Sequence, residues 1–329
     1  MNQALTGFVL EDIYYGHETG DHHPECKQRL DSVKRALKHP DLEGRLKRVK
    51  ARAANDDEIL LCHTSAYLEL VKKEIGSGAM CLSTGDTDVC ESTLEAARYA
   101  AGGVLCAVDE VISGRLQNVL CAPRPPGHHA NAAHGMGFCV FNNIALGARY
   151  AQKKHGLGKV LIVDWDVHHG NGTQDIFYED GSVLFFSTHQ HPWYPGTGWA
   201  EEIGKGKGRH TTINCPFPAG AGKNLILGAM REKLLPAART FKPELLMISA
   251  GFDSREGDPL GRFVLSDVDF ANATKMLCEL AEEFCEGRVV STLEGGYNLE
   301  GLEKGVAAHL KALTREAGKR KGEGMKEEG

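Results

Sequence analysis

The sequence predicts an α/β protein: a single domain built on an open parallel sheet with helices on both faces. Four short apolar runs have the length and composition of buried parallel strands, at residues 118–121, 159–163, 245–249 and 289–293. Stretches with helix-favouring composition and helical spacing of apolar residues lie between them, at residues 91–111, 142–154, 225–241 and 267–286. Because strands and helices alternate, a parallel sheet covered by helices is the expected architecture.

The composition is typical of a globular enzyme, since 42% of the 329 residues are hydrophobic and 25% are charged. No Pro-, Ser- or Gly-rich linker, internal repeat or transmembrane run interrupts the chain. We therefore expect one catalytic domain over residues 1–313. Residues 314–329 are rich in Lys, Glu and Gly, and we expect them to form a frayed helix end and a solvated tail.

Charge, N-terminus and cysteines restrict the partners and the compartment. A formal net charge of −6 at pH 7 disfavours general nucleic-acid binding but is compatible with basic peptides or polyamines. The N-terminus lacks the basic and apolar regions of a signal peptide. The ten cysteines have no disulfide-framework spacing and no Cys-x-x-Cys pair, which suits a reducing compartment. We expect a cytoplasmic protein without a membrane or nucleic-acid partner.

Potential metal ligands follow two of the predicted strands. Residues 164–171 read Asp-Trp-Asp-Val-His-His-Gly-Asn, and Asp253 follows the next predicted strand. Side chains alternate along an extended chain, so Asp164, Asp166 and His168 are expected to point the same way, at the edge where open α/β sheets bind ligands. A lone Asp-x-Asp is more often a solvated turn, and Asp253 alone fits a helix cap equally well. Their concentration at strand ends favours a metal site.

Two further strand ends carry groups suited to acid–base chemistry. The pair His128 and His129 follows Arg-Pro-Pro-Gly after the strand at 118–121. Tyr297 follows Glu-Gly-Gly after the strand at 289–293, and the glycines allow the backbone to turn the phenol toward the same edge. Alone, the histidines would be interpreted as a surface pair and the tyrosine as a core residue. Polar groups at four strand ends favour one shared active site.

The ordered set of motifs resembles the arginase/deacetylase superfamily and, within it, the class II histone deacetylase-like enzymes. The matching segments run in family order from about residue 17 to residue 300 and include residues 23–30, 124–130, 137–143, 164–172, 194–198, 249–261 and 293–298. Each segment is weak alone, but their order is specific. The resemblance implies the arginase/deacetylase fold and zinc-dependent hydrolysis of N-acetyl or other N-acyl amides on long amine side chains. Acetyl-lysine in a protein or peptide is the expected substrate.

The resemblance assigns metal ligands and an oxyanion donor. Asp166, His168 and Asp253 match three protein ligands of a catalytic Zn²⁺ that keeps an open coordination position, and the hardness of these ligands makes Fe²⁺ an alternative. Tyr297 matches the tyrosine that donates a hydrogen bond to the scissile carbonyl and then to the oxyanion. Tyrosine rather than histidine at this position favours an active deacetylase.

The tandem histidines take distinct roles by the same resemblance. His129 is the main general base and acid, while His128 supports charge and hydrogen bonding. Asp164 matches the carboxylate that orients His128. Asn171 stands where class I relatives carry an Asp partner of His129. The imidazole of His129 is therefore expected to be less strongly biased toward its cation.

Substrate contacts follow from the same motifs. Gly137, Phe138, Trp193 and Tyr194 match the walls of a narrow acyl-lysine tunnel, although core packing is an alternative for the aromatic residues. Leu260 matches the rim, where polyamine-selective relatives can carry an acidic gatekeeper. The apolar leucine at this position, in place of an acidic residue, favours acyl-lysine over acetylpolyamine.

The resemblance also implies two sites for K⁺ or Na⁺. The first matches Asp164, Asp166, His168 and Ser187, and the second matches Phe177, Asp180 and Val183.

Three other functions stay open. An acetylpolyamine amidohydrolase would use the same chemistry on a small acetylated amine. A binuclear manganese ureohydrolase would share the fold but need further His and Asp ligands. A non-catalytic acyl-lysine binding module would keep the tunnel and lose the chemistry, which the presence of Tyr297 disfavours.

Overall fold

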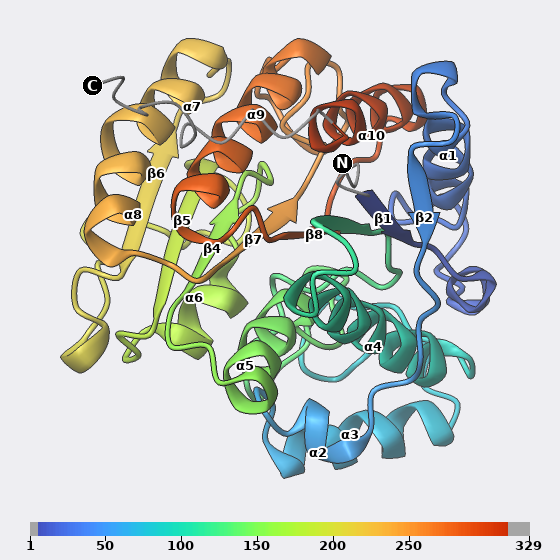
Figure 1. The fold of residues 1–329 in the computed structure, drawn as a ribbon. Helices are drawn as coiled ribbons and strands as arrows, with labels where there is room; N and C mark the ends of the chain where they lie inside the picture. The colour runs from blue at the N-terminus through green and yellow to red at the C-terminus, as the bar shows by residue number, and fades with distance from the viewer. Residues whose placement is uncertain (1–5, 315–329) are drawn as a thin grey trace, which may run out of the picture.

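The structure, a computed structural model, describes residues 6–314. Its centre is one parallel sheet with the strand order β2-β1-β3-β8-β7-β4-β5-β6 (Figure 1). Within the described residues the eight strands are β1 (Thr6–Val9), β2 (Leu46–Arg48), β3 (Asn118–Cys121), β4 (Val160–Asp164), β5 (Val183–Gln190), β6 (Thr212–Phe217), β7 (Leu245–Ala250) and β8 (Val289–Leu293).

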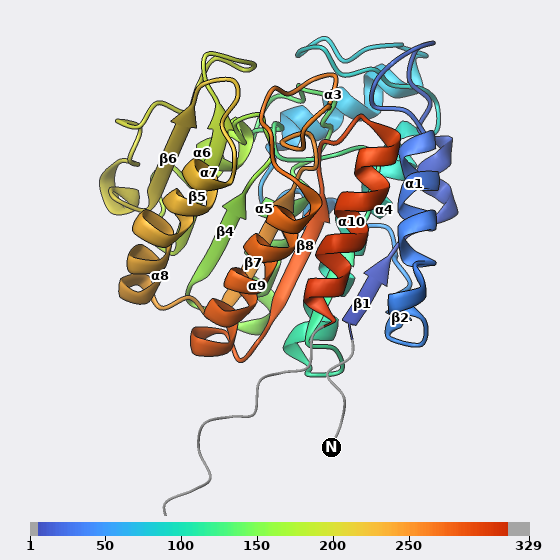
Figure 2. The same ribbon diagram turned by 90° about the horizontal axis from the view of Figure 1, so that it is seen from above.

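Helices cover both faces of this sheet, as the sequence predicts (Figures 1 and 2). One face packs against α1 (Gln28–Leu37), α7 (Lys223–Ala229), α8 (Leu235–Phe241), α9 (Asp267–Phe284) and α10 (Leu299–Leu313). The other face packs against α4 (Thr93–Ile112), α5 (Asn143–His155) and α6 (Asn171–Phe177), with α2 (Asp56–Ile59) and α3 (Ser65–Gly76) lying against α5 and α4. The strands are therefore buried on both sides.

Strand β4 and helix α5 show how local sequence sets these elements. All five residues of β4 are buried because the strand lies between β5 and β7 and under helices on both faces. The α5 helix begins where the Asn142 side chain accepts a hydrogen bond from the Ala145 amide. It ends at Gly156, whose φ of 71° is a left-handed conformation that glycine adopts without steric cost.

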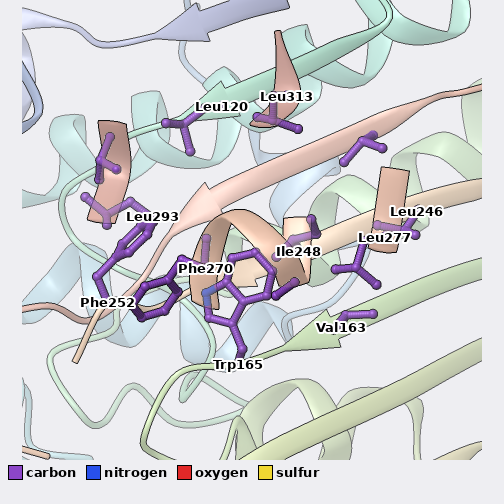
Figure 3. Packing of buried hydrophobic residues seen from close by; sticks show 14 of the residues in the cluster. Leu120, Val163, Trp165, Leu246, Ile248, Phe252, Phe270, Leu277, Leu293 and Leu313 are labelled. Atoms are coloured by element: carbon purple, nitrogen blue, oxygen red, sulfur yellow. The ribbon is translucent and has the colours of Figure 1, made fainter. Parts of the chain in front are cut away.

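Large core side chains anchor the segments that follow β4 and β7. Trp165 and Phe252 both pack against Phe270 of α9, with ring centroids 6.3 and 5.1 Å away respectively (Figure 3). Both aromatic side chains are fully buried. Trp165 lies between Asp164 and Asp166 in the sequence, and Phe252 directly precedes Asp253. Truncating a buried aromatic side chain costs about 3–5 kcal/mol of stability. The core therefore fixes the backbone from which those acidic side chains project.

The predicted elements are present, with small shifts. Strands β3 and β8 have the predicted bounds, β4 is shifted by one residue toward the C-terminus, and β7 is one residue longer than predicted. The single helix predicted at 225–241 is α7, a π-helical turn (Met230–Leu234) and α8 in succession. The structure also contains elements that were not predicted from the sequence, namely the strands β1, β2, β5 and β6 and the helices α1, α2, α3, α6 and α10.

The ends of the chain bear on two predictions. Helix α10 ends at Leu313 with Thr314 as its C-cap, and the predicted tail beyond it lies outside the described residues. Among residues 6–314, no helix has both the length and the apolar character needed to cross a membrane.

Candidate active site

The four strands whose ends carry polar groups are neighbours in the sheet. They lie side by side in the order β3-β8-β7-β4, and their carboxyl ends point to the same edge (Figure 2). The loops after them carry the histidine pair, the tyrosine, Asp253 and the segment 164–171. The topology therefore gathers these groups at one place, as expected for an open α/β sheet.

Asp166, His168 and Asp253 form one buried cluster. Nδ1 of His168 lies 3.0 Å from Oδ1 of Asp166 and 3.1 Å from Oδ2 of Asp253. One potential ligand atom from each residue lies within 4.8 Å of the other two. The amide of Gly295 donates to Oδ2 of Asp166 (2.8 Å), and the amide of Val167 donates to Oδ1 of Asp253 (2.9 Å). Backbone contacts thus fix both carboxylates.

The residues of this cluster fit a divalent metal ion. Two buried carboxylates repel each other, and burial, followed by the charge of Asp166, raises the pKa of Asp253 to about 7. A bound cation would compensate this cost. Gly251 and Gly295 border the cluster, where an added Cβ would lie 2.0 Å from Asp166 Oδ2 and 1.9 Å from Asp253 Oδ2 respectively. Two carboxylates and one imidazole are a donor set suited to Zn²⁺ or Fe²⁺.

Asp164 lies beside this cluster but is not one of the three residues placed to share an ion. Strand β4 ends at Asp164, and the chain bends over the next residues. The fully buried Asp164 instead lies 2.9 Å from Nδ1 of His128 through Oδ2, and its Oδ1 accepts from the Asp166 amide. It is therefore placed to orient the histidine.

The tandem histidines sit in opposite electrostatic surroundings. Their rings are 4.0 Å apart between centroids, and Nδ1 of His129 lies 2.8 Å from Oδ1 of Asn171. Burial lowers the pKa of His128, but the charges of Asp164 and then Asp166 have the larger combined effect. The pKa of His128 is therefore raised to about 10. Burial, followed by the charge of His128, holds the pKa of His129 well below its usual value. His129 is thus the neutral imidazole of the pair.

Tyr297 follows a glycine turn that a buried arginine supports. Gly296 has a φ of 121°, and the Tyr297 amide donates to Oδ2 of Asp258 (2.7 Å). Nε of Arg29 donates to the Gly296 carbonyl (2.8 Å), and its guanidinium carbon lies 5.1 Å from the Tyr297 ring centroid. Burial raises the pKa of Tyr297 well above its ordinary value. The phenol therefore keeps its proton and can donate a hydrogen bond.

A cavity of about 250 Å³ leads to these groups. Its walls are Asp86, His129, Gly137, Phe138, His168, Trp193, Tyr194, Leu260 and Tyr297. Edge-to-face contacts order the walls: the ring centroid of Tyr194 lies 5.2 Å from that of His129, and the ring of Phe138 lies 6.1 Å from that of Tyr297. Every residue that the sequence predicts to contact substrate lines this cavity, and so does His129, whereas His128 does not.

The residues predicted to bind monovalent cations form two groups. Asp164 and Ser187 are register partners on β4 and β5, beside the metal cluster. In the second group, Phe177 ends α6, its carbonyl accepts from the Asp180 amide (3.0 Å), and Val183 begins β5.

Glu294 was not predicted to be part of the site, and Arg29, which lies in the matching segment 23–30 and resembles a channel arginine only loosely, was given no role at the Tyr297 turn. Oε2 of Glu294 accepts hydrogen bonds from the amides of Gly127 (2.7 Å) and His128 (3.1 Å), and burial raises the pKa of Glu294 to about 7. Arg29, described above, supports the Tyr297 turn. A glutamate between an apolar strand and two glycines is a signal that could have identified Glu294. Nothing in the sequence around Arg29 predicts that it is fully buried.

Fold and site together define a class of protein. A parallel α/β sheet carries, at one edge, a metal-type Asp-His-Asp cluster, a neutral histidine and a protonated tyrosine at the end of an aromatic-walled cavity. This combination is typical of metal-dependent hydrolases that act on a linear amide.

Comparisons with known proteins identify the family. Residues 23–313 match the family described as "Histone deacetylase domain". "Histone deacetylase 14, chloroplastic" of Arabidopsis thaliana is 39% identical over 92% of this chain and 75% of its own length. "Polyamine deacetylase HDAC10" of Homo sapiens is 41% identical over 88% of this chain and 45% of its own length.

A solved structure supports the same assignment. The crystal structure of the HDA15 HD domain has a TM-score of 0.89 and 37% sequence identity, covering 94% of this chain and 90% of that one. The chain therefore belongs to the histone deacetylase family. The predicted arginase/deacetylase fold and the predicted class of hydrolytic, metal-dependent deacetylase are confirmed.

Proposed function

We propose that this protein removes acetyl groups from the amine end of long side chains, with Nε-acetyl-lysine in a protein or peptide as the main substrate. The observation that carries the proposal is the cavity itself. Aromatic rings line it and His129, His168 and Tyr297 lie along it. A narrow apolar passage suits the methylene chain of lysine, and the polar groups suit the amide at its tip.

The proposed ligands of the ion are Asp166, His168 and Asp253, which would hold Zn²⁺ or, alternatively, Fe²⁺. Such an ion supplies a Lewis acid that polarises the acyl carbonyl and increases the acidity of water. The backbone amides that hold both carboxylates keep this donor set in place without substrate. Preorganisation of this kind lowers the cost of reaching the reactive geometry.

Three side chains would act on the amide and the attacking water: His129 by proton transfer, and His128 and Tyr297 by stabilising negative charge. His129, neutral and held through Nδ1 by Asn171, takes a proton from the attacking water and later gives it to the leaving amine. His128, held by Asp164 and cationic at neutral pH, stabilises the negative charge that develops beside it. The phenol of Tyr297 donates a hydrogen bond to the acyl oxygen as it becomes an oxyanion.

Further parts of the proposal concern the domain, the monovalent ions and the compartment. We assign the catalytic domain to residues 1–313, and K⁺ or Na⁺ to the two groups of residues described above. The first group is Asp164, Asp166, His168 and Ser187, and the second is Phe177, Asp180 and Val183. A cytoplasmic location stays a prediction from the cysteine pattern.

An acetylpolyamine is the second candidate substrate, because one relative is named a polyamine deacetylase. The apolar Leu260 in the cavity wall favours acyl-lysine, since it offers no charge to a distal ammonium. Rates on an acetyl-lysine peptide, longer acyl-lysines and acetylated polyamines, measured side by side, test the proposal. A higher kcat/KM on the polyamine would overturn the preference for acyl-lysine.

The other two functions lack support. A binuclear manganese site needs further ligands, and Asp166, His168 and Asp253 are the one group of three or more His, Cys, Asp or Glu side chains within residues 6–314 placed to share an ion. A non-catalytic module would not need the neutral His129 and the protonated Tyr297 in the same cavity. Metal stoichiometry and turnover of a fluorogenic acetyl-lysine peptide separate these functions.

A further inference from the structure

His169 joins two parts of the molecule that the proposed mechanism treats separately. Only 1% of it is exposed, and it directly follows the metal-cluster residue His168. Its Nδ1 lies 2.8 Å from Oγ1 of Thr197, and its Nε2 lies 3.1 Å from Oε1 of Gln174. Both ring nitrogens are therefore engaged, one by the loop after Tyr194 and the other by helix α6.

Gln174 extends this connection to a carboxylate. Its Nε2 donates to Oε2 of Glu202 (2.5 Å), and its Oε1 accepts from Nδ2 of Asn214 (2.7 Å). A carboxylate oxygen accepts hydrogen bonds, so the Nε2 atom of Gln174 must face Glu202. The Oε1 atom of Gln174 must then face His169. The carboxylate of Glu202 also accepts from the amide of Trp199 (3.1 Å). The chain of hydrogen bonds from Thr197 through His169 and Gln174 to Glu202 thus begins and ends on the loop that follows Tyr194.

Gly198 lets this loop lie directly on two neighbouring imidazoles, whose rings are tilted by 51° to each other. The rings of His169 and His189 are 4.7 Å apart between centroids, and Nε2 of His189 lies 2.9 Å from the Gly198 carbonyl oxygen. Gly198 has a φ of 88°, and an added Cβ would lie 2.5 Å from Nε2 of His189 and 2.7 Å from Cδ2 of His169. The close approach therefore requires glycine.

The loop held in this way carries the aromatic wall of the cavity. The Gly196 amide donates to the Trp193 carbonyl (2.8 Å), closing a turn that contains Tyr194. The ring of Tyr194 packs edge-on against His129, whose partner Asn171 lies on α6, the same helix as Gln174. One helix thus supports both the proposed base and, through His169, the wall beside it.

We propose that His169 is a positioning residue that orders the Trp193–Tyr194 wall through Thr197 and Gln174, and so sets the affinity for long acyl-amine chains. This inference rests on the proposed function. The contacts act on the wall and touch no reacting atom, so their loss removes binding that the ground state and the transition state share. Such a loss raises KM and leaves kcat nearly unchanged.

The variant Thr197→Val removes one hydrogen bond to His169 and keeps the size of the side chain. We expect KM for an acetyl-lysine peptide to rise about 2- to 12-fold, the factor that corresponds to the net worth of one hydrogen bond, with kcat within twofold of wild type. Thr197→Ser keeps the hydroxyl and should restore the wild-type KM. Thr240→Val is the matched control, because Thr240 is also exposed and donates a hydrogen bond, in α8.

Two measurements report on the wall without turnover. Of the three tryptophans, Trp165 is 1% exposed, so acrylamide quenching of fluorescence reports on Trp193 and Trp199. Quenching should increase in Thr197→Val, with and without metal. A hydroxamate carrying a six-carbon chain should bind this variant more weakly by the same factor as the change in KM. Acetohydroxamate, which is too short to fill the cavity, should bind it as it binds the wild type.

The outcomes are distinguishable. Wild-type KM and quenching in both Thr197→Val and a second variant, Glu202→Gln, would overturn the inference. Increased quenching with unchanged KM and unchanged long-chain hydroxamate binding would also overturn it, because a loosened wall would then not affect substrate. If the wild type fails to hydrolyse acetyl-lysine peptide while quenching and long-chain hydroxamate binding change as expected, the proposed function fails and the positioning role of His169 stands.

Discussion

Replacing Gly295 with alanine tests how closely the protein is built around the proposed metal ligands. The added Cβ would lie 1.9 Å from Oδ2 of Asp253 and 2.7 Å from Oδ2 of Asp166. Carbon and oxygen cannot approach so closely, so Oδ2 of Asp253 must move by about 1 Å or the turn must shift. Either movement would disturb a hydrogen bond, because the Gly295 amide donates to Asp166 and the Val167 amide donates to Asp253.

The expected result is a loss of metal affinity. Changes that disturb the orientation of a ligand without removing it cost about 10- to 100-fold in metal affinity, which is about 1.4–2.8 kcal/mol. The assay titrates metal-free protein with Zn²⁺ in competition with a chelating indicator. Gly228→Ala, in α7, is the matched control, because nothing lies within 4 Å of its added Cβ. A folded Gly295→Ala protein that binds Zn²⁺ within twofold of wild type would refute the reasoning.

Three further predictions follow from other parts of the structure. Burial raises the pKa of Glu25, but the charges of Arg124 and then Arg29 have the larger combined effect. The pKa of Glu25 is therefore lowered to about 2. The stability from this ionised group is therefore present above the unfolded pKa of about 4.3 and is lost as pH falls through 2. Glu25→Gln should cost about 3–5 kcal/mol in urea unfolding at pH 7, and a loss under 1 kcal/mol would contradict this. Asp253→Asn should lower metal content by elemental analysis, and unchanged content would disprove the ligand assignment. Leu260→Glu should raise the ratio of kcat/KM for acetylpolyamine over acetyl-lysine peptide a few-fold, since an exposed ion pair contributes about 0.2–1 kcal/mol; an unchanged ratio in folded, metal-loaded protein would place Leu260 away from the substrate.

The predictable part of the fold is the part that the core dictates. Strands β3, β4, β7 and β8 lie in the middle of the sheet and are buried on both faces, so each appears in the sequence as a continuous apolar run. The edge strand β2 has no such run, because its Lys47 and Arg48 are exposed. Strand β5 does contain an apolar run at residues 183–186, so this strand is predictable from the sequence by the same criterion.

The site was predictable where a motif brings its groups close in the chain, and less so where the fold brings them together. His128, His129 and the segment 164–171 stand out because ligand-type residues are adjacent. The network of His169 does not, because its partners come from α6, β6 and the loop after Tyr194, and only the packed structure joins them. The contacts of Arg29 were similarly hidden, although Arg29 lies in a matching family segment, since its partners on the β8 loop are more than 260 residues away in sequence.

The central claim, that this cavity deacetylates an acyl amine with Tyr297 as oxyanion donor, is tested most directly by one comparison. Turnover of a fluorogenic acetyl-lysine peptide is measured for wild type and Tyr297→Phe, each with its metal content determined. We expect one divalent ion per chain in both proteins, measurable turnover in wild type, and a loss of about 10²–10³ in kcat for Tyr297→Phe. Near-normal turnover in metal-loaded Tyr297→Phe would contradict it.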